Sequence, residues 1–523
     1  MGDARVIAAD VSYVRSVTGA CGPFLRPTKT GRGMMSRSAF AGAVSIVRVN
    51  KTVTLSFLVV SAAILIGSLA AGPALALSTF TVNRTTNESD ASTADGMCDV
   101  DAATAGNQCT LKAAIQQANA NANPTETDTI RFKIPGDPTK LKSIKPTSEL
   151  PAITQSVFIN GYSQRGSSQN TRARGAINAV PKIQLDGSGI TGPGAADADG
   201  LTIQGASNIT IRGLVINRFG RSGIFLTSTD GSDNNHIEGN FIGTNAAGTA
   251  IADASGDPIG NGAKGVEING NNAGNVVGGS APEQRNLISG NEGDGVFAGT
   301  DGTDTIQGNL IGTDKTGTKD LHNGGTSENG EGVNLGGQNS VVLDNIIAFN
   351  TSDGVQVRSN FTGTGHDIGP NSIFSNDGLG IDLVDGTING VPSNGDGTNA
   401  NDGGTANDAD TGPNDMQNFP TISSARTSSS TGDTTIRAFV DTVPNTEYLI
   451  RFYSNARDTA EGKTFIGDRA VTTDANGIFS ISDFVANRTV PVGQSITATA
   501  TRVVAPRNTS EFSGESRPVR SAP

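Results

Sequence analysis

Short runs of alternating apolar and polar residues, separated by Gly, Asn and Asp, fill most of the chain after Thr129. Such alternation predicts β-strands whose side chains point in turn to an interior and to an exterior. Six of these runs share one pattern: Gly is followed by Val or Ile, then by any residue, then by an apolar residue. The six glycines are Gly223, Gly265, Gly295, Gly332, Gly354 and Gly380. The repetition predicts six strands that stack in register.

Two longer segments also repeat one another. "HIEGNFIGTNAAGT" runs from His236 to Thr249, and "TIQGNLIGTDKTGT" runs from Thr305 to Thr318. A period of 20 to 50 residues per unit is typical of a solenoid or a propeller. Because each unit holds three very short strands and no helix, we expect a parallel β-helix over residues 129–385, with the echo marking a super-repeat of two coils. The polar stretches after the echoed segments are expected to be protruding loops.

The residues after the repeated glycines are expected to form one inward ladder, because β-branched side chains pack well on stacked strands. This ladder comprises Ile224, Val266, Val296, Val333, Val355 and Ile381. Asn291, Asn350 and Asn376 each lie four residues before a repeated Gly. Asn tolerates left-handed turns and can bond to an Asn one coil away, so we interpret these residues as structural.

The two ends of the predicted solenoid differ from its middle. Residues 77–128 contain "CTLKAAIQQANANAN", in which Thr110 is a plausible N-cap and the helix Thr110 to Asn119 is amphipathic. We expect this helix to cover the first coil. Residues 386–418 are rich in Asp, Asn and Gly and predict a linker. Longer strands return in residues 419–523 and predict a small β-sandwich of immunoglobulin-like type.

The first 76 residues predict a leader. Val53 to Ala71 carries no charge, basic residues precede it, and "ALA" at Ala74 to Ala76 follows it. This pattern is typical of a secretory signal peptide cleaved near Ala76, and an uncleaved membrane anchor is the alternative. Cys98 and Cys109 are expected to form a disulfide in an exported protein. The formal net charge of −12 argues against nucleic acid as a partner.

These segments resemble a known group of exported bacterial proteins. "CTLKAAIQQANAN" resembles their Cys-Ser-Leu-Arg-Glu-Ala (CSLREA) module, although this chain departs from the motif at Thr110, Lys112 and Ala114. "NVVGG…RNLISGNEGDGVFAG…IQGNLIGTDKTGT" resembles the right-handed parallel β-helix repeats that follow the module. The resemblance implies an exported all-β protein with a C-terminal sandwich. It implies no activity, because β-helices host lyases, hydrolases, epimerases, adhesins and inert stalks.

Candidate chemistry lies in the residues just before the repeated glycines. Asp294, Glu331 and Asp353 are expected to stack in adjacent coils about 4.8 Å apart, with Lys264 beside Asp294. Stacked carboxylates repel unless they are solvated, protonated or bridged by a cation. A solvated turn is the favoured interpretation, and a cation site or an acid/base pair is the alternative.

A second row is expected to point outward from the same strands. It comprises Phe225, Glu267, Phe297, Asn334, Gln356 and Asp382. Aromatic and amide side chains on a flat sheet can hold a sugar chain, so Phe225, Phe297, Asn334 and Gln356 are candidate ligand-binding residues. An ordinary surface is the alternative, because lone exposed aromatics are common. The absence of Trp weakens the sugar interpretation.

The linker and the histidines offer further candidate metal ligands. Asp402, Asp408, Asp410 and Asp415 alternate with Asn and Gly, and oxygen ligands at such spacing suit Ca²⁺. A disordered polar linker explains the same composition. His236, His322 and His366 fall in different parts of the repeat, so we expect turn or surface roles for them.

The sequence therefore favours an exported or surface-bound β-helix that acts as a structural, adhesion or carbohydrate-binding module and is monomeric. The expected partner is a polysaccharide or a cell-surface protein. The alternative is a polysaccharide-active enzyme, a glycoside hydrolase or lyase, that uses Asp294, Glu331 and Asp353. No Ser-His-Asp arrangement or phosphate-binding Gly loop is evident in the sequence.

Overall fold

The structure is a computed structural model, and residues Pro73–Pro523 form one compact unit in it. It describes residues 78–121, 126–228, 231–270, 272–299, 302–325, 330–358, 363–384, 387–388, 391–392, 397–402, 411–456, 459–514 and 517–522. The predicted leader and signal peptide lie outside the described residues.

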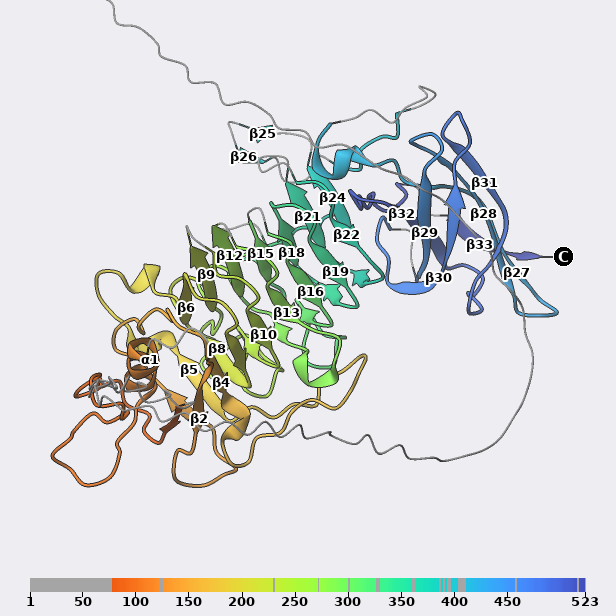
Figure 1. The fold of residues 1–523 in the computed structure, drawn as a ribbon. Coiled ribbons are helices and arrows are strands. Elements are labelled where there is room, and N and C mark those ends of the chain that lie inside the picture. Colours follow the sequence, from red (N-terminus) through yellow and green to blue (C-terminus); the bar gives the residue numbers. More distant parts are fainter. Residues whose placement is uncertain are drawn as a thin grey trace, which may run out of the picture. The chain divides into compact units, whose positions relative to one another are not determined.

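Three parallel sheets form a right-handed β-helix, as predicted, and each coil passes from sheet A to sheet B to sheet C (Figure 1). Sheet A contains β1 (Thr79–Val82), β2 (Asp128–Phe132), β4 (Val157–Asn160), β7 (Thr210–Arg212), β10 (His236–Glu238), β13 (Val276–Gly278), β16 (Thr305–Gln307), β19 (Val341–Leu343) and β22 (Asp367–Ile368). Sheet B contains β3 (Lys142–Ile144), β5 (Ile183–Asp186), β8 (Leu214–Asn217), β11 (Phe241–Ile242), β14 (Leu287–Ile288), β17 (Leu310–Ile311), β20 (Ile346–Ala348) and β23 (Ser372–Phe374). Sheet C contains β6 (Leu201–Gln204), β9 (Ile224–Ser228), β12 (Val266–Gly270), β15 (Val296–Ala298), β18 (Val333–Leu335), β21 (Val355–Arg358) and β24 (Ile381–Val384).

Shorter elements connect these strands. A small antiparallel pair, β25 (Thr387–Ile388) and β26 (Val391–Pro392), follows the last coil. The 3₁₀ turns are η1 (Gly161–Ser163), η2 (Gly187–Gly189), η3 (Ala195–Asp197), η4 (Pro282–Gln284) and η6 (Pro413–Met416). Parallel pairing begins at Thr79, about 50 residues before the predicted start of the solenoid, because β1 pairs with β2.

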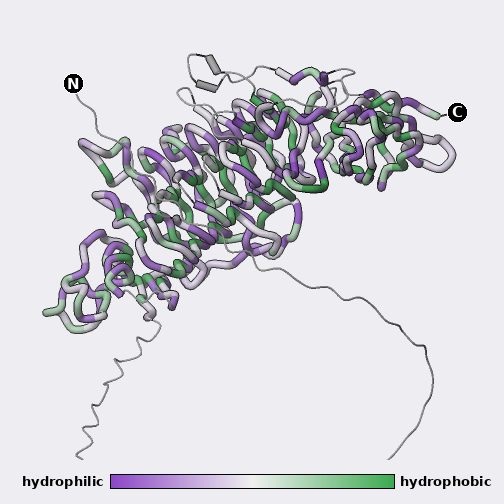
Figure 2. Tube along the Cα trace, turned by 45° about the horizontal axis from the view of Figure 1, so that its top comes forward, coloured by the Kyte–Doolittle hydropathy of each residue, from purple (hydrophilic) through white to green (hydrophobic). Residues whose placement is uncertain are grey.

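The predicted inward ladder is confirmed in sheet C, where each of its residues pairs with its equivalent in the next coil. All six ladder side chains are buried in the solenoid core, and apolar and polar positions alternate along the coils (Figure 2). The repeated glycines have a steric reason. A Cβ on Gly332 would lie 2.6 Å from the carbonyl oxygen of Gly354 in the next coil, so a side chain there would force the coils apart.

Two buried columns of Asn side chains run along the coils. The first Asn ladder comprises Asn240, Asn286, Asn309, Asn345 and Asn371. The second Asn ladder comprises Asn261, Asn291, Asn323, Asn350 and Asn376. In each column the Nδ2 of one Asn donates to the Oδ1 of the next, as predicted for Asn291, Asn350 and Asn376. The sequence analysis missed the first column, and in the second column it missed the first member, Asn261, and the intermediate member Asn323.

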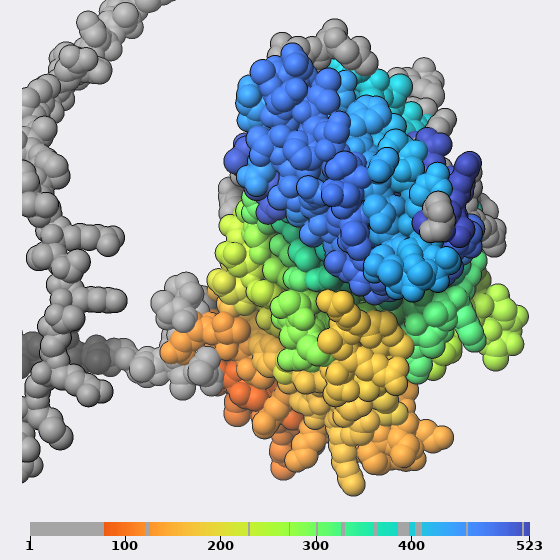
Figure 3. Space-filling model, turned by 90° about the vertical axis from the view of Figure 1, so that its right-hand side faces the viewer, coloured from red at the N-terminus to blue at the C-terminus, as the bar shows by residue number. Residues whose placement is uncertain are grey.

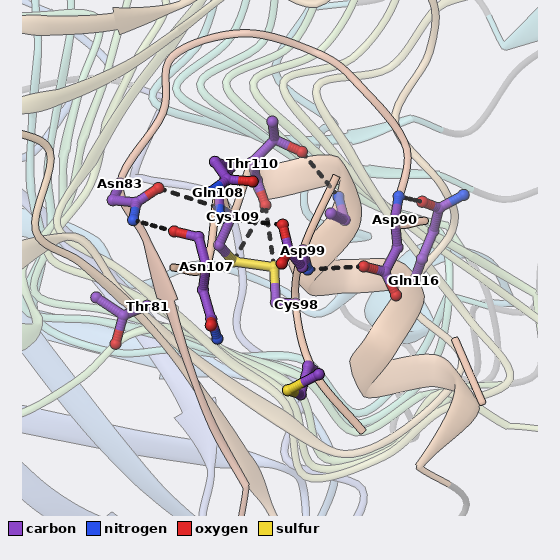
Figure 4. Close-up of a disulfide and its surroundings, with 12 residues drawn as sticks. Thr81, Asn83, Asp90, Cys98, Asp99, Asn107, Gln108, Cys109, Thr110 and Gln116 are labelled. Carbon is purple, nitrogen blue, oxygen red and sulfur yellow. Dashed lines mark hydrogen bonds between the residues drawn. A yellow bond between two sulfur atoms is a disulfide. The ribbon is translucent and has the colours of Figure 1, made fainter. Parts of the chain in front are cut away.

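The N-terminal end is closed by α1 (Leu111–Ala120), which packs on β1 and β2, so the predicted cap is confirmed. Thr110 is its N-cap and accepts a hydrogen bond from the Ala113 amide. Cys98 and Cys109 form a disulfide just before the helix (Figure 4). Asn83 accepts a hydrogen bond from the Cys109 amide through Oδ1, which ties the disulfide to the strand that enters the solenoid.

Residues after the linker form a β-domain with its own hydrophobic core. Its strands are β27 (Thr421–Ser428), β28 (Thr434–Asp441), β29 (Glu447–Asn455), β30 (Thr464–Thr472), β31 (Ile478–Val485), β32 (Ser495–Arg502) and β33 (Arg517–Ala522). The strand order is β30-β29-β32-β33-β27-β28-β31, and the pairing is antiparallel except between β27 and β33. The edge strands approach each other, because the Asn487 amide donates to the Ile466 carbonyl. We call this part the C-terminal domain.

The C-terminal domain lies against the solenoid (Figure 3). It contacts the last coil through both apolar and polar groups. Tyr453 and Phe512 belong to the hydrophobic cluster of the solenoid. Ile373 and Gly462 exchange two main-chain hydrogen bonds, and Glu461 accepts the amide of Asn376 at 2.9 Å. The second Asn ladder therefore ends on a carboxylate from the C-terminal domain. Among the described residues, helices long and apolar enough to cross a bilayer were not found.

Candidate functional site

The predicted row of acids is present in sheet C and is buried. The main-chain amides after Asp294 and Glu331 bond to the next coil, so the three acids lie in successive coils. Asp294, Glu331 and Asp353 are only 3%, 0% and 1% exposed. The expectation of a solvated turn is therefore wrong. Because burial removes the water that screens like charges, the carboxyl groups must be protonated, hydrogen-bonded or matched by cations.

Asp294 lies at the centre of this row. It accepts a hydrogen bond from the Glu331 amide at 3.3 Å and one from the Asn334 Nδ2 at 3.3 Å. Burial raises the pKa of Asp294 well above its ordinary value, and the hydrogen bond and charge of Glu331 add to the effect. Lys264 and Arg358 oppose the shift but do not cancel it. Asp294 therefore favours its protonated form more strongly than an ordinary aspartic acid, and its hydrogen bond to Glu331 contributes to this preference.

Two oxygen atoms beside Asp294 have no hydrogen-bond partner among the described residues. They are Glu331 Oε2 and Asn334 Oδ1, and both side chains are fully buried. Buried polar atoms without partners cost free energy, so they mark a place where a structure is open to a further donor or cation. No group of three or more His, Cys, Asp or Glu side chains able to hold a metal ion occurs in the described part of the chain.

Asp353 lies two coils further along the row than Asp294, beyond Glu331. Its carboxylate accepts a hydrogen bond from the Leu379 main-chain amide at 2.6 Å and one from the Gln356 side-chain Nε2 at 3.3 Å. Burial raises the pKa of Asp353, and the neighbouring charge of Glu331 adds to the rise. The row therefore contains two buried carboxyls whose pKa values are raised, Asp294 and Asp353, with Glu331 between them.

The N-terminal half of the sheet C face carries a network built on Arg221. Its guanidinium bonds to Asp199 at 2.8 Å and to Glu267 at 3.0 Å, and it lies 4.0 Å from the centre of the Phe225 ring. Ser222 Oγ donates to the same Glu267 carboxylate at 2.6 Å. Burial raises the pKa of Asp199 to about 6 despite this guanidinium. Arg221 and Phe225 are half-buried, so this platform reaches solvent.

Sequence reasoning missed Asp199 and Arg221. Asp199 occupies the position before Gly200, which is the equivalent of the repeated glycines one coil earlier, because the Leu201 amide bonds to the Gly223 carbonyl. Its unit, "DGLTI", has Leu where the other units have Val or Ile. A pattern that allowed Leu would have found Asp199. Arg221 carried no such signal, since its role depends on contacts across three coils.

The second predicted row is in register along sheet C: Phe225 pairs with Glu267, then come Phe297, Asn334, Gln356 and Asp382. Lys264 and Arg358 lie 5.6 and 5.7 Å from the centre of the Phe297 ring. The row points away from the core of the coils, but Phe297 is only 8% exposed, and Asn334, Gln356 and Asp382 are fully buried. The outer face is therefore accessible mainly around Phe225.

The other candidates are dispersed. Asp402 accepts a hydrogen bond from Asn418 Nδ2 and Asp415 accepts one from Asn508 Nδ2, while Asp408 and Asp410 lie outside the described residues. The structure thus brings no calcium ligands together among the described residues.

The three histidines lie far apart in the repeat, as expected. His322 is on a loop 3.0 Å from Asp320, and His236 begins β10. His366 is fully buried, so of the two expected roles, in a turn or at the surface, the surface role does not apply to it. Burial lowers the pKa of His366 to about 4, so its ring is neutral, accepts the Ser340 amide and bonds to the Gly337 carbonyl. This residue has a structural role in the last turn of the solenoid.

The raised pKa values of Asp294 and Asp353 suit acid/base chemistry, but the geometry of the carboxyl row differs from that of common glycosidases. Those enzymes hold their two acids roughly 5 to 10 Å apart so that a sugar or water fits between them. Asp294 and Glu331 are hydrogen-bonded to each other and are buried. Direct attack on a polymer requires exposed groups, so the row in this structure serves cohesion between coils more readily than turnover.

No family model matches the chain, and no curated protein matches it. Among solved structures, pectate lyase Pel9A is 14% identical with a TM-score of 0.28, over 57% of this chain and 73% of that one. Tailspike protein 2 of Escherichia coli O157:H7 bacteriophage CAB120 is 11% identical with a TM-score of 0.18, over 72% of this chain and 57% of that one. The ORF18 protein of Geobacillus virus E2 is 12% identical with a TM-score of 0.23, over 79% of each chain. Likenesses this weak carry no argument about activity.

Proposed function

We propose that this chain is an exported polysaccharide-binding β-helix protein, and that the ligand lies on the N-terminal half of the sheet C face. The observation that carries the proposal is the platform of Phe225 and Arg221, a half-buried ring with a guanidinium 4.0 Å above it. Aromatic rings and planar cations stack on sugar rings, and carboxylates such as Glu267 accept bonds from hydroxyl groups.

The spacing of the platform suits an extended ligand. Phe225 and Phe297 lie on the same row two coils apart, which is about 10 Å at the strand spacing of parallel sheets. Glu267 lies between them, and Lys264 borders the second ring. Phe225 is the more accessible of the two rings, since Phe297 is only 8% exposed, so a polymer that crosses the strands would stack on Phe225.

The test is binding to a glycan array, followed by titration of the polysaccharide that binds. Phe225→Ala should weaken binding at least tenfold, because it removes the ring on which the sugar and Arg221 stack. Phe439→Ala is the matched control, since Phe439 is 41% exposed on β28 of the C-terminal domain. Equal binding by both variants and the parent chain would remove the sheet C surface from consideration.

A polysaccharide-active enzyme is the second candidate, favoured by the buried carboxyls Asp294 and Asp353, whose pKa values are raised by burial. A carboxyl that keeps its proton near neutral pH can act as a general acid. Release of reducing ends or unsaturated products from any polysaccharide, abolished by Asp353→Asn or Asp294→Asn, would establish this activity. Absence of products from the ligand identified on the array would leave the binding function alone.

Two further parts of the proposal concern residues that the structure does not describe fully. Export rests on the signal-like segment Val53 to Ala71, and the intact mass of the secreted chain, with cleavage near Ala76 expected, tests it. Calcium binding by Asp402, Asp408, Asp410 and Asp415 rests on oxygen ligands at short spacing. If calcium binds, proteolysis within residues 386–418 slows on adding Ca²⁺ and recovers with chelator.

A further inference from the structure

A groove of about 560 Å³ lies at the corner of the coil where the chain passes from sheet A to sheet B. Its floor is made by residues that occupy the same register position, just past the sheet A strand, in four successive coils. These residues are Gly279, Gly308, Asp344 and Pro370. The groove therefore runs across the coils and presents the same backbone position about every 4.8 Å, over roughly 14 Å.

One wall of the groove is the loop that contains Arg174. Arg285 fixes this wall to the floor: its Nε donates to the Gly308 carbonyl at 2.7 Å, and its Nη1 and Nη2 donate to the carbonyls of Arg172 and Gly175 at 3.0 and 2.8 Å. Asn170 adds a bond from Nδ2 to the Pro282 carbonyl. The loop is thus held as a preformed wall rather than shaped by a ligand.

The groove is positively charged although the chain as a whole is acidic. Arg285 is only 3% exposed, and its hydrogen-bond partners in the described part of the chain are main-chain carbonyls. Burial lowers its pKa to about 10, so it remains charged at neutral pH. Arg174 and Lys463 are exposed on the two sides, and neither forms an ion pair in the described part of the chain. Asp344 is the single carboxylate in the lining, against three cations.

We propose that this groove binds a carboxylated oligosaccharide. The buried guanidinium of Arg285 has no carboxylate partner among the described residues, which favours an anionic ligand. Arg174 and Lys463 can each pair with a carboxylate of the oligosaccharide. The floor repeats once per coil, so it matches a ligand with a repeating unit, and the amides and hydroxyls of Gln307 and Ser372 can meet sugar hydroxyls. A peptide would need side-chain pockets or a free strand edge, and the groove crosses the strands instead.

The site is independent of the sheet C surface proposed above, so failure at one leaves the other standing. The test uses the secreted chain and an oligogalacturonate, with its fully methyl-esterified form as a neutral probe of equal length. Binding should require free carboxylates and weaken as salt is raised. The double variant Arg174→Gln, Lys463→Gln should bind at least tenfold more weakly, whereas Arg174→Lys, Lys463→Arg should stay within about threefold of the parent.

The matched control is Lys140→Gln, Arg520→Gln, which removes the same charge from exposed positions elsewhere and should stay within twofold. All four altered residues are exposed, so thermal melting is expected to be unchanged and confirms folding. The proposal would be overturned if the Arg174→Gln, Lys463→Gln variant bound the oligogalacturonate as tightly as the parent chain. It would also be overturned if the esterified probe bound as tightly as the free carboxylate form. Binding of polyglutamate or of a sulfated oligosaccharide in preference to oligogalacturonate would also overturn it.

Discussion

Asp304 shows how one residue of a repeated column can make stability depend on pH. It follows Asn235 and Asn275 in a third column, where each side chain accepts the main-chain amide of the preceding member. Asn275 also donates its Nδ2 to Asp304 at 3.2 Å. Burial raises the pKa of Asp304 to about 6. The repeat thus holds a carboxyl in a place where its neighbours are neutral amides.

Replacing Asp304 with Asn should stabilise the protein at pH 7. A raised folded-state pKa means that the stability Asp304 contributes is fully present below its unfolded pKa of 3.8 and is lost as the pH rises through about 6. Asp304→Asn removes that loss and keeps the acceptor for Asn275, so we expect a gain of about 1 to 3 kcal/mol at pH 7 that shrinks towards pH 4. Urea midpoints at pH 4 and pH 7 measure it.

Asp377→Asn is the control for this experiment, because Asp377 is exposed in the last coil. Its midpoint should follow that of the parent at both pH values. A gain for Asp304→Asn that is equal at pH 4 and pH 7 would show that the effect comes from packing and not from ionisation.

Single residues of the repeated coils show what the sequence can and cannot predict. The glycines before Val296 and Val355 predicted register, because a Cβ there would collide with the next coil whatever the rest of the fold does. The burial of Asp294 and Glu331 was not predictable, since the local pattern is that of an exposed turn and only packing across coils removes the water. Asn323 escaped detection because it lies inside a loop insertion, where the spacing to the repeated Gly changes.

At the scale of elements, the second Asn ladder ties successive coils together. Asn323 is fully buried; it accepts from Asn291 and donates to the Asn350 Oδ1 at 3.0 Å and to the Ile288 carbonyl at 3.1 Å. Asn323→Ala would leave these groups buried without partners. Each such group costs about 1 to 3 kcal/mol, so we expect a loss of roughly 3 kcal/mol or more in the free energy of unfolding. Asn107→Ala, on an exposed loop, should cost less than about 0.5 kcal/mol in the same urea titration.

The helix α1 protects the first coil in a different way, by covering apolar side chains and an unpaired sheet edge. Ile115 is 1% exposed on the face that packs against the solenoid. Ile115→Asp loses the buried side chain and adds an unpaired charge, so we expect a loss of about 4 kcal/mol or more, with aggregation. Ala120→Asp, at the exposed end of the same helix, is the control. Unchanged melting of the Ile115 variant would contradict the capping role.

At the scale of the whole molecule, the C-terminal domain closes the other end of the solenoid. The contacts are of several kinds: Leu383 donates its amide to Glu511 at 3.0 Å, Arg451 bonds to Asp367 at 3.3 Å, and Asn414 bridges His366 and Thr509. A sandwich on a flexible linker would share few such bonds with its neighbour. The linker prediction described the composition of residues 386–418 correctly but did not foresee this docking, because the contacts involve single residues far apart in sequence.

Phe512 tests whether the solenoid and the C-terminal domain unfold together. It is 2% exposed, its ring meets Tyr453 edge-on at 5.2 Å, and it packs against Gly380 of the last coil. Phe512→Ala would leave a cavity where the two cores join, at a cost of about 3 to 5 kcal/mol. Since the loss falls on the junction, we expect the single transition of the parent in calorimetry to split into two. Phe439→Ala, in the same domain but 41% exposed, should keep one transition. Two transitions in the parent chain itself would show that the docking contacts do not couple the two parts.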